Sequence, residues 1–135
     1  MREIAGGCLC GRVRYSATAD PAVIAVCHCK NCQRQSGTAF GTVVGVPKGT
    51  LNVTGTLRTY EDISETGNAM HRQFCPECGS RIATDADGMP NLTFIMAGTL
   101  DDTSWVDPTV QFWCESAQPW VSLPEKVQPF QRMPG

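Results

Sequence analysis

The sequence predicts a mainly β protein, built from small antiparallel sheets and braced by bound metal. Short runs of alternating or β-branched residues are separated by Gly and Pro, and helical periodicity is weak. Eight cysteines are present, most of them closely spaced. The length of 135 residues and a hydrophobic content of 41% suit one domain with one core, spanning residues 1–135.

The first expected strand covers residues 11–19, where Val13, Tyr15 and Ala17 alternate with polar residues. Residues 51–53 and 57–60 flank Thr54-Gly55-Thr56, which predicts a hairpin. Further strands are expected over 22–29, 39–46, 70–75, 92–100 and 110–116.

Two helical segments are expected, and both are short. Residues 30–36 suit one or two turns of helix that end at Gly37. Residues 101–105 suit a single turn before Pro108.

Charge and hydropathy exclude several classes of protein. The net charge of −2, without a run of Lys and Arg, speaks against nucleic acid as a partner. No apolar stretch reaches 18 residues and no signal-peptide centre is present, so we expect neither a membrane span nor export. In the cytoplasm eight cysteines indicate metal binding rather than disulfides.

The cysteines fall into three groups and one isolated residue. We expect Cys-x-Cys pairs to lie in strands, where residues i and i+2 share a face. Leu9 would then point into the core, and His28 would lie on the face opposite its neighbouring cysteines. The groups are Cys8 with Cys10, then Cys27, Cys29 and Cys32, then Cys75 with Cys78, and Cys114 stands alone.

The segment from Cys75 to Gly79, CPECG, has the form of a zinc-ribbon knuckle, because Pro fixes φ and Gly permits positive φ. A structural zinc ion needs four ligands. Cys8 and Cys10 together with Cys75 and Cys78 supply them from two distant segments.

The middle group has three cysteines, Cys27, Cys29 and Cys32, and no obvious fourth ligand. Three protein ligands with one open position are typical of a catalytic zinc site. Three thiolates suit exchange of a soft sulfur ligand better than hydrolysis, so the open position would take a thiol, with water as the other occupant. Cys114 could close the site, but its alternation with Phe112 favours a core position.

The two histidines have simpler expected roles. His28 is expected to pack on the far side of its strand rather than to act as an acid or base. His71 is expected at the surface or behind a metal ligand.

Several residues near the second group remain open to interpretation. Ser36 and Thr38 are as well suited to cap a turn as to donate to a substrate. Trp113 and Trp120 are expected to be ordinary aromatics of a core strand and turn. Arg34 is expected in solvent rather than on a substrate carboxylate.

The cysteine order and its flanking residues resemble the GFA family, the glutathione-dependent formaldehyde-activating enzymes, which also includes centromere protein V. The similar stretches are residues 6–15 (GGCLCGRVRY), 27–37 (CHCKNCQRQSG), 74–80 (FCPECGS) and 111–120 (QFWCESAQPW). The resemblance implies the β-tent fold of small sheets around a structural zinc. Gln111 stands where many members carry histidine, so any proton transfer by that histidine would be missing.

The resemblance also implies ligands and a reaction. Cys8, Cys10, Cys75 and Cys78 would hold the structural zinc, and the Cys27, Cys29, Cys32 group a second, functional zinc. The family reaction joins glutathione and formaldehyde into S-(hydroxymethyl)glutathione and is grouped with carbon–sulfur lyases. We therefore expect a cytoplasmic carbon–sulfur lyase with two zinc ions and a small thiol substrate such as glutathione. The alternative is a non-enzymatic zinc-binding module for a protein partner.

Overall fold

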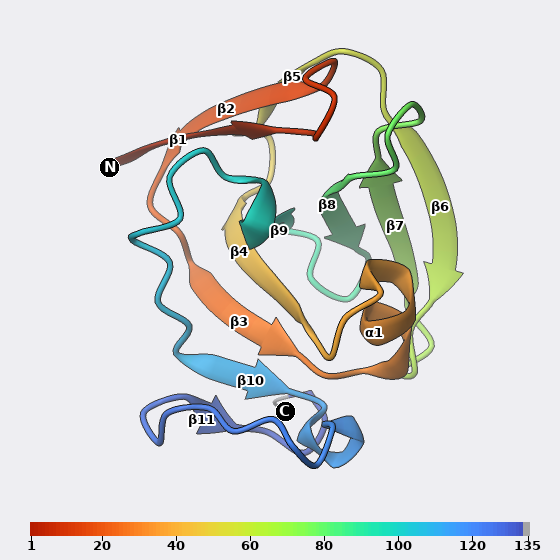
Figure 1. The fold of residues 1–135 in the computed structure, drawn as a ribbon, viewed down its shortest axis with the longest axis vertical. Coiled ribbons are helices and arrows are strands. Elements are labelled where there is room, and N and C mark those ends of the chain that lie inside the picture. The colour runs from red at the N-terminus through yellow and green to blue at the C-terminus, as the bar shows by residue number, and fades with distance from the viewer. Residues whose placement is uncertain (134–135) are drawn as a thin grey trace.

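The computed structural model describes residues 1–133 and contains two β-sheets (Figure 1). The smaller sheet is antiparallel, with strand order β1-β2-β5. Along β2, buried and exposed residues alternate as the sequence pattern predicts, because one face of the strand meets the core. The strands are β1 (Arg2–Gly7), β2 (Arg14–Ala19) and β5 (Asn52–Thr54).

The larger sheet has eight strands in the order β11-β10-β3-β4-β9-β8-β7-β6. Its pairs are antiparallel except where β10 runs parallel to β3 and to β11. The sheets do not close into a barrel, since β6 and β11 each form a free edge. The strands are β3 (Val23–Cys27), β4 (Gly41–Pro47), β6 (Arg58–Ile63), β7 (Ala69–Phe74), β8 (Arg81–Ala86), β9 (Leu92–Met96), β10 (Val110–Phe112) and β11 (Gln128–Pro129).

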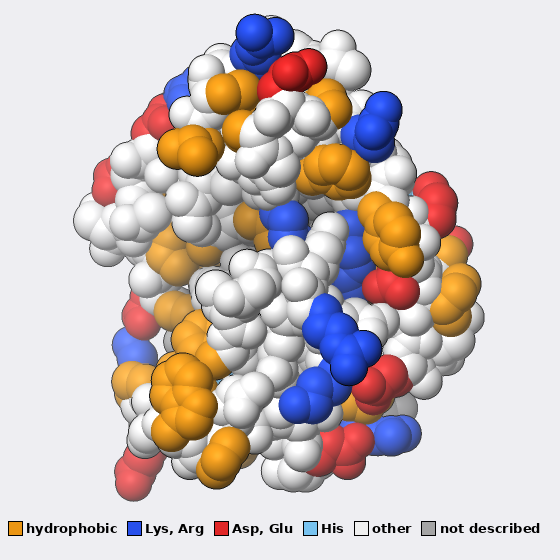
Figure 2. Space-filling model, turned by 45° about the vertical axis from the view of Figure 1, so that its right-hand side comes forward, with side chains coloured by type: hydrophobic (Ala, Val, Ile, Leu, Met, Phe, Trp, Pro, Cys, Tyr) orange, Lys and Arg blue, Asp and Glu red, His pale blue; other side chains and the backbone are white. Residues whose placement is uncertain are grey.

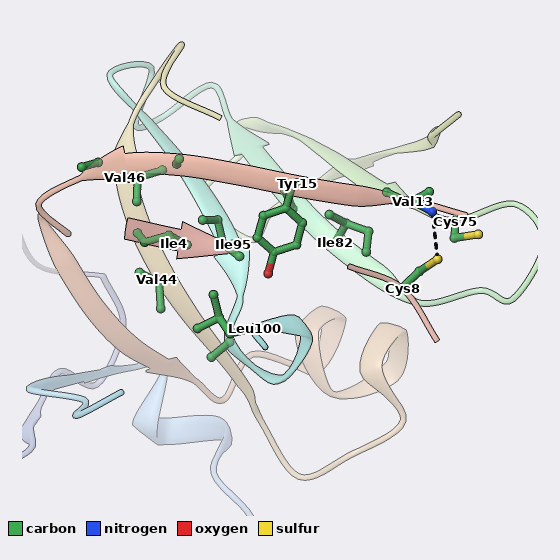
Figure 3. Packing of buried hydrophobic residues seen from close by; sticks show 14 residues of the cluster. Ile4, Cys8, Val13, Tyr15, Val44, Val46, Cys75, Ile82, Ile95 and Leu100 are labelled. Atoms are coloured by element: carbon green, nitrogen blue, oxygen red, sulfur yellow. Dashed lines mark hydrogen bonds between the residues drawn. The ribbon is translucent and has the colours of Figure 1, made fainter. Parts of the chain in front are cut away.

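The main core lies between the small sheet and the centre of the large sheet (Figure 3). Tyr15 of β2 projects among Ile82 of β8, Ile95 of β9 and Leu100, and all four are buried. The Tyr15 hydroxyl is hydrogen-bonded to Thr99 Oγ1 at 2.7 Å, so the one polar atom of this aromatic side chain has a partner. The mainly β fold with small antiparallel sheets is therefore confirmed.

The helix α1 (Lys30–Ser36) follows β3 and lies beside β7 and β8 in Figure 1. Its bounds match the prediction, and Gly37 ends it with a left-handed φ of 68°. The Gly37 N–H donates to the Gln33 carbonyl oxygen at 2.8 Å, as expected of such an end. Within residues 1–133 no helix has the length and apolar character needed to cross a membrane.

Two expected strands are shorter than predicted, because each ends in a turn of 3-10 helix. The segment 92–100 contains β9 and then Ala97–Thr99, and the segment 110–116 contains β10 and then Cys114–Ser116. In the second case Trp113 has a φ of 59°, a left-handed conformation that ends the strand.

The predicted hairpin around Thr54-Gly55-Thr56 is wrong. β5 pairs with β2 and β6 pairs with β7, so the two segments belong to different sheets. Gly55 has a φ of 95°, and a Cβ at this position would overlap the carbonyl oxygen of Arg12. The chain is thus pressed against the segment before β2 and crosses from one sheet to the other instead of folding back.

No helix forms over 101–105, and the segment contains only one hydrogen-bonded turn, in which the Val106 N–H donates to the Thr103 carbonyl oxygen at 3.1 Å. Asp102 Oδ1 accepts hydrogen bonds from the Ser104 N–H at 2.9 Å and the Ser104 hydroxyl at 2.6 Å. This local bonding of an aspartate to the backbone two residues on competes with helix formation.

Candidate functional site

The first cysteine group joins the turn after β1 to the turn before β8. The sulfur atoms of Cys8, Cys10, Cys75 and Cys78 all lie within 4.8 Å of one another. The Cys8 and Cys10 sulfurs are 3.5 Å apart, and the Cys10 and Cys75 sulfurs are 3.8 Å apart. Four sulfurs arranged tetrahedrally at about 2.3 Å from one ion would be roughly 3.8 Å apart. The group therefore fits a tetrahedral metal ion.

Backbone and hydroxyl donors surround these sulfurs. The Val13 N–H donates to Cys8 Sγ at 3.2 Å, which Figure 3 shows as a dashed line. The Ser80 hydroxyl lies 3.3 Å from Cys78 Sγ, and hydrogen bonds from Ser80 lower the pKa of the Cys78 thiol to about 5. The Gly79 N–H donates to the Cys75 carbonyl oxygen at 2.9 Å and closes the knuckle. The site is thus prepared to hold at least one thiolate.

The expectation that Cys8 and Cys10 lie in a strand is wrong. Residues 8–11 form a turn, in which the Gly11 N–H donates to the Cys8 carbonyl oxygen at 3.2 Å. Leu9 is 87% exposed and does not enter the core. The turn brings both sulfurs into one group while the Leu9 side chain between them faces solvent, so Leu9 makes none of the core contacts expected of a residue on the inner face of a strand.

The second group gathers Cys27, Cys29 and Cys32, whose sulfurs also lie within 4.8 Å of one another. Cys27 is the last residue of β3, Cys29 is the N-cap of α1, and Cys32 lies in its first turn. Cys29 Sγ accepts a hydrogen bond from the Cys32 N–H at 3.3 Å, so a cysteine takes the place usually held by serine or aspartate. The three sulfurs therefore meet where a strand passes into a helix, rather than along one strand.

The crowding of these three sulfurs shifts their protonation in opposite directions. Hydrogen bonds with Cys29 and Cys32 raise the pKa of Cys27, while hydrogen bonds from Cys27 and Cys29, together with Arg72, lower the pKa of Cys32. A soft cation would replace the shared protons, so the donor set fits a thiophilic metal ion.

No fourth Cys, His, Asp or Glu within residues 1–133 joins this second group. Cys114 lies outside it, with its sulfur 3.7 Å from the Gln111 carbonyl oxygen. The site therefore offers three protein ligands.

A cavity of about 260 Å³ adjoins the second group, and Cys27, Cys29 and Cys32 line part of it. Its exposed surface is mostly apolar. Phe94 and Phe112 contribute aromatic rings, as does Trp113, which is buried next to the left-handed turn that ends β10.

Arg72 of β7 lies directly behind the second group. It is buried, its Nε donates to Asp62 Oδ2 at 3.0 Å, and one Nη donates to Gln35 Oε1 at 3.2 Å. The same Nη is 3.9 Å from Cys32 Sγ. Burial alone would lower the pKa of Arg72, but the Cys32 thiolate and Asp62 outweigh it and raise this pKa. A fixed positive charge thus faces the sulfurs.

Two further polar side chains of β8, Arg81 and Thr84, line the same cavity. The Arg81 Nη1 and the Thr84 Oγ1 are buried and have no hydrogen-bond partner in the part of the chain that the structure describes. Burial lowers the pKa of Arg81, and the nearby thiolate of Cys32 opposes this effect. Buried donors without partners are rare and costly, so each is available to a bound molecule.

Sequence reasoning missed Arg72, Arg81 and Thr84. The one available signal was that Arg81 lies two residues after Gly79, the end of the knuckle, since β7 and β8 show no pattern that separates cavity residues from others.

His28 packs as expected on the far side from the cysteines. It is fully buried, lies edge-on to Phe40, and does not line the cavity. Its Nε2 donates to Gln111 Oε1 at 2.9 Å, because the Gln111 amide nitrogen donates to the Val127 carbonyl oxygen at 3.2 Å. Gln111 therefore positions His28 and does not reach the cavity.

Of the other sequence candidates, Ser36 and Thr38 have capping roles. The Ser36 hydroxyl donates to the Cys32 carbonyl oxygen at 2.6 Å, and the Thr38 hydroxyl to the Phe40 carbonyl oxygen at 2.7 Å. Trp120 lies in a turn, as expected, which the Val121 N–H closes by donating to the Gln118 carbonyl oxygen at 3.1 Å. Its side chain is 73% exposed, whereas Trp113 is buried and lines the cavity.

Two charged candidates lie where the sequence predicted. Arg34 is exposed. His71 is at the surface between Glu61 and Asp87, which raise its pKa. On the face shown in Figure 2, acidic and basic side chains are mixed, and no continuous basic patch is visible.

The comparisons with known proteins agree with this arrangement. A crystal structure of a Rhodobacter sphaeroides protein is similar with a TM-score of 0.60, at 22% sequence identity over 77% of this chain and 91% of that one, which supports the fold. A search of curated proteins found no match. The family profile described as "Glutathione-dependent formaldehyde-activating enzyme" matches residues 3–116, which include both cysteine groups. With most of its length matched by this profile, the chain belongs to the GFA family.

Proposed function

We propose that this chain is a zinc-dependent carbon–sulfur lyase that adds a small thiol to an aldehyde or releases the aldehyde from the adduct. Glutathione and formaldehyde are the pair named by the family description. The observation that carries the proposal is the group of Cys27, Cys29 and Cys32, which has three ligands and adjoins an apolar cavity. The group of Cys8, Cys10, Cys75 and Cys78 would hold a second, structural zinc ion.

The reaction itself is an addition that needs no oxidant. A carbon–sulfur bond forms between the thiol sulfur and the carbonyl carbon, and the π electron pair of the C=O bond moves to oxygen. That oxygen then takes up a proton equivalent to the one the thiol has released. A zinc ion held by the three cysteines would lower the pKa of the thiol, so that its sulfur is deprotonated at neutral pH.

The chain's own residues have two roles in this proposal. Arg72, fixed by Asp62, holds a positive charge beside Cys32 and offsets the excess negative charge of three thiolates. Arg81 and Thr84 have unpartnered donors at the cavity and are the candidates to bond the oxygen that gains negative charge. The apolar walls limit water, which strengthens both effects.

Metal counting with a matched pair of variants tests the proposal. The wild type should bind two zinc ions, and Cys29→Ser should bind one and lose catalysis while staying folded. The fold should survive because a serine oxygen can accept the N-cap hydrogen bond from the Cys32 N–H. Cys114→Ser is the control, since Cys114 belongs to neither group.

Because thiols and formaldehyde also combine without a catalyst, the assay should measure exchange at equilibrium. Two-dimensional NMR exchange spectroscopy gives the rate of interconversion of glutathione and its hydroxymethyl adduct. The proposal expects acceleration by the wild type and by Cys114→Ser, and none by Cys29→Ser. A wild type with one zinc ion, three readily alkylated cysteines and no acceleration would instead indicate a non-enzymatic zinc-binding module.

A further inference from the structure

Four of the five methionines in the chain lie around the same cavity. They come from separate segments: Met70 from β7, Met89 from the turn after β8, Met96 from the end of β9, and Met133 from the C-terminal segment. The fifth, Met1, is 87% exposed at the N-terminus. The cavity is therefore distinguished by flexible, polarisable apolar side chains that can adapt to the shape of a guest.

Most polar residues of the cavity lie in two places, and the buried Thr84 of β8 is a further polar residue of the lining. Arg72 and Arg81 lie near the cysteine group, as described above. Glu65, Thr66 and Asn68 belong to the turn between β6 and β7 and are exposed, so they lie at the mouth. Between these two places the lining consists mainly of methionine and aromatic side chains.

The volume sets the size of a suitable guest. An apolar protein cavity of about 150 Å³ is enough to bind benzene. The cavity here measures about 260 Å³. It has room for one aromatic ring, or an alkyl chain of similar size, together with the carbon that carries a sulfur atom. Methionine sulfur also makes favourable contacts with aromatic rings.

We propose that the preferred thiol of this site carries an apolar aryl or alkyl group, which lies among the four methionines while its sulfur meets Cys27, Cys29 and Cys32. That the ligand is a thiol rests on the proposed function, and that it carries an apolar group is inferred from the cavity lining. Glutathione has two charged ends, and within residues 1–133 the lining offers them, besides the ion-paired Arg72, only Arg81 near the cysteines and Glu65 at the exposed mouth. An apolar thiol leaves no such charge to be desolvated.

Methionine methyl NMR tests this directly, because the chain contains its own control. In zinc-loaded protein labelled with [methyl-¹³C]methionine, phenylmethanethiol should shift the signals of Met70, Met89, Met96 and Met133 and leave that of Met1 unchanged. At equal concentration 2-mercaptoethanol, which has the thiol but no apolar group, should shift them much less. Lengthening an alkanethiol should strengthen binding about fourfold for each methylene that enters the cavity.

Two variants at one position locate the guest. Met89 is half-buried, so replacing it should not disturb the main core. Met89→Gln should weaken binding of phenylmethanethiol about tenfold or more, whereas Met89→Leu should change it about threefold or less, because leucine keeps the lining apolar.

The outcomes separate this inference from the proposed function. Acceleration of the glutathione reaction without methionine shifts by phenylmethanethiol would overturn the inference and leave the proposed function standing. Methionine shifts without any catalysis would support the apolar cavity and refute the enzyme. Equal shifts with 2-mercaptoethanol, or equal effects of the two Met89 variants, would also overturn the inference.

Discussion

The first cysteine group links two distant segments of the chain. Cys78→Ser is therefore a quantitative test of the proposal that this group holds a structural metal ion. Cys10 and Cys75, whose sulfurs are 3.8 Å apart, are separated by 65 residues in the sequence. A metal ion bound to both ends closes this loop in the folded state, and removing one of its four ligands weakens the closure.

The magnitude can be worked from the loop length. Cross-linking a loop of 65 residues removes conformational entropy from the unfolded chain worth about 4 kcal/mol at 25 °C. A domain of this size unfolds with an entropy of about 0.3 kcal/mol per kelvin at its midpoint. Complete loss of the link therefore lowers the unfolding midpoint by about 15 °C. The corresponding free energy of about 4 kcal/mol is a large part of the stability of an ordinary domain.

Thermal unfolding followed by circular dichroism at fixed zinc concentration measures this effect. Cys78→Ser should show the large decrease, whereas Cys29→Ser and Cys114→Ser should each remain within about 5 °C of the wild type. The reasoning is refuted if Cys29→Ser and Cys78→Ser lower the midpoint equally. Retention of both zinc ions by Cys78→Ser, with an unchanged midpoint, would refute it as well.

Two further predictions concern the surface and the core. Glu61 and Asp87 raise the pKa of His71 in the folded protein. Their interaction with the charged imidazolium should therefore stabilise the fold fully at pH values below the unfolded-state pKa of about 6.5. This stabilisation should be lost as the pH rises through the higher pKa of the folded state. NMR titration of the His71 ring should show the raised pKa, and His71→Asn should flatten the dependence of stability on pH in that window. Ile82 is fully buried, so Ile82→Ala should lower the free energy of unfolding by about 2–5 kcal/mol in urea titrations. Ile63→Ala is the control, since Ile63 is mostly exposed and should change stability by about 0.5 kcal/mol or less.

Local sequence signals predicted the parts of the fold that local chemistry determines. Helix α1 and its end at Gly37 follow from a short polar segment before a glycine. The knuckle from Cys75 to Gly79 follows from a proline and a glycine at fixed positions. The division of seven cysteines into a group of four and a group of three follows from spacing and ligand number.

Features that depend on distant contacts were missed. The crossing at Gly55 is set by its close approach to Arg12, which no local pattern records. Strands β1 and β8 were not anticipated, because their partners β2, β7 and β9 supply much of the reason for their conformation. Leu9 is exposed because residues 8–11 form a turn, where the Cys-x-Cys pattern predicts a strand.

The cavity residues were missed for a similar reason. Arg72 and Arg81 look like ordinary strand arginines in the sequence, and only the sheet brings them behind Cys32. The four methionines are spread over more than 60 residues, so their meeting at one cavity is a property of the topology alone.

The position of Arg81 connects the two cysteine groups through the backbone. It is the first residue of β8 and follows Cys78 to Ser80 without any intervening loop, yet it lines the cavity that adjoins the other cysteine group. A chain that loses its structural ion would release the strand end from which this arginine extends, and with it a cation next to the reactive sulfurs. Cys78→Ser should therefore also disturb the cavity, although Cys27, Cys29 and Cys32 remain unchanged in that variant.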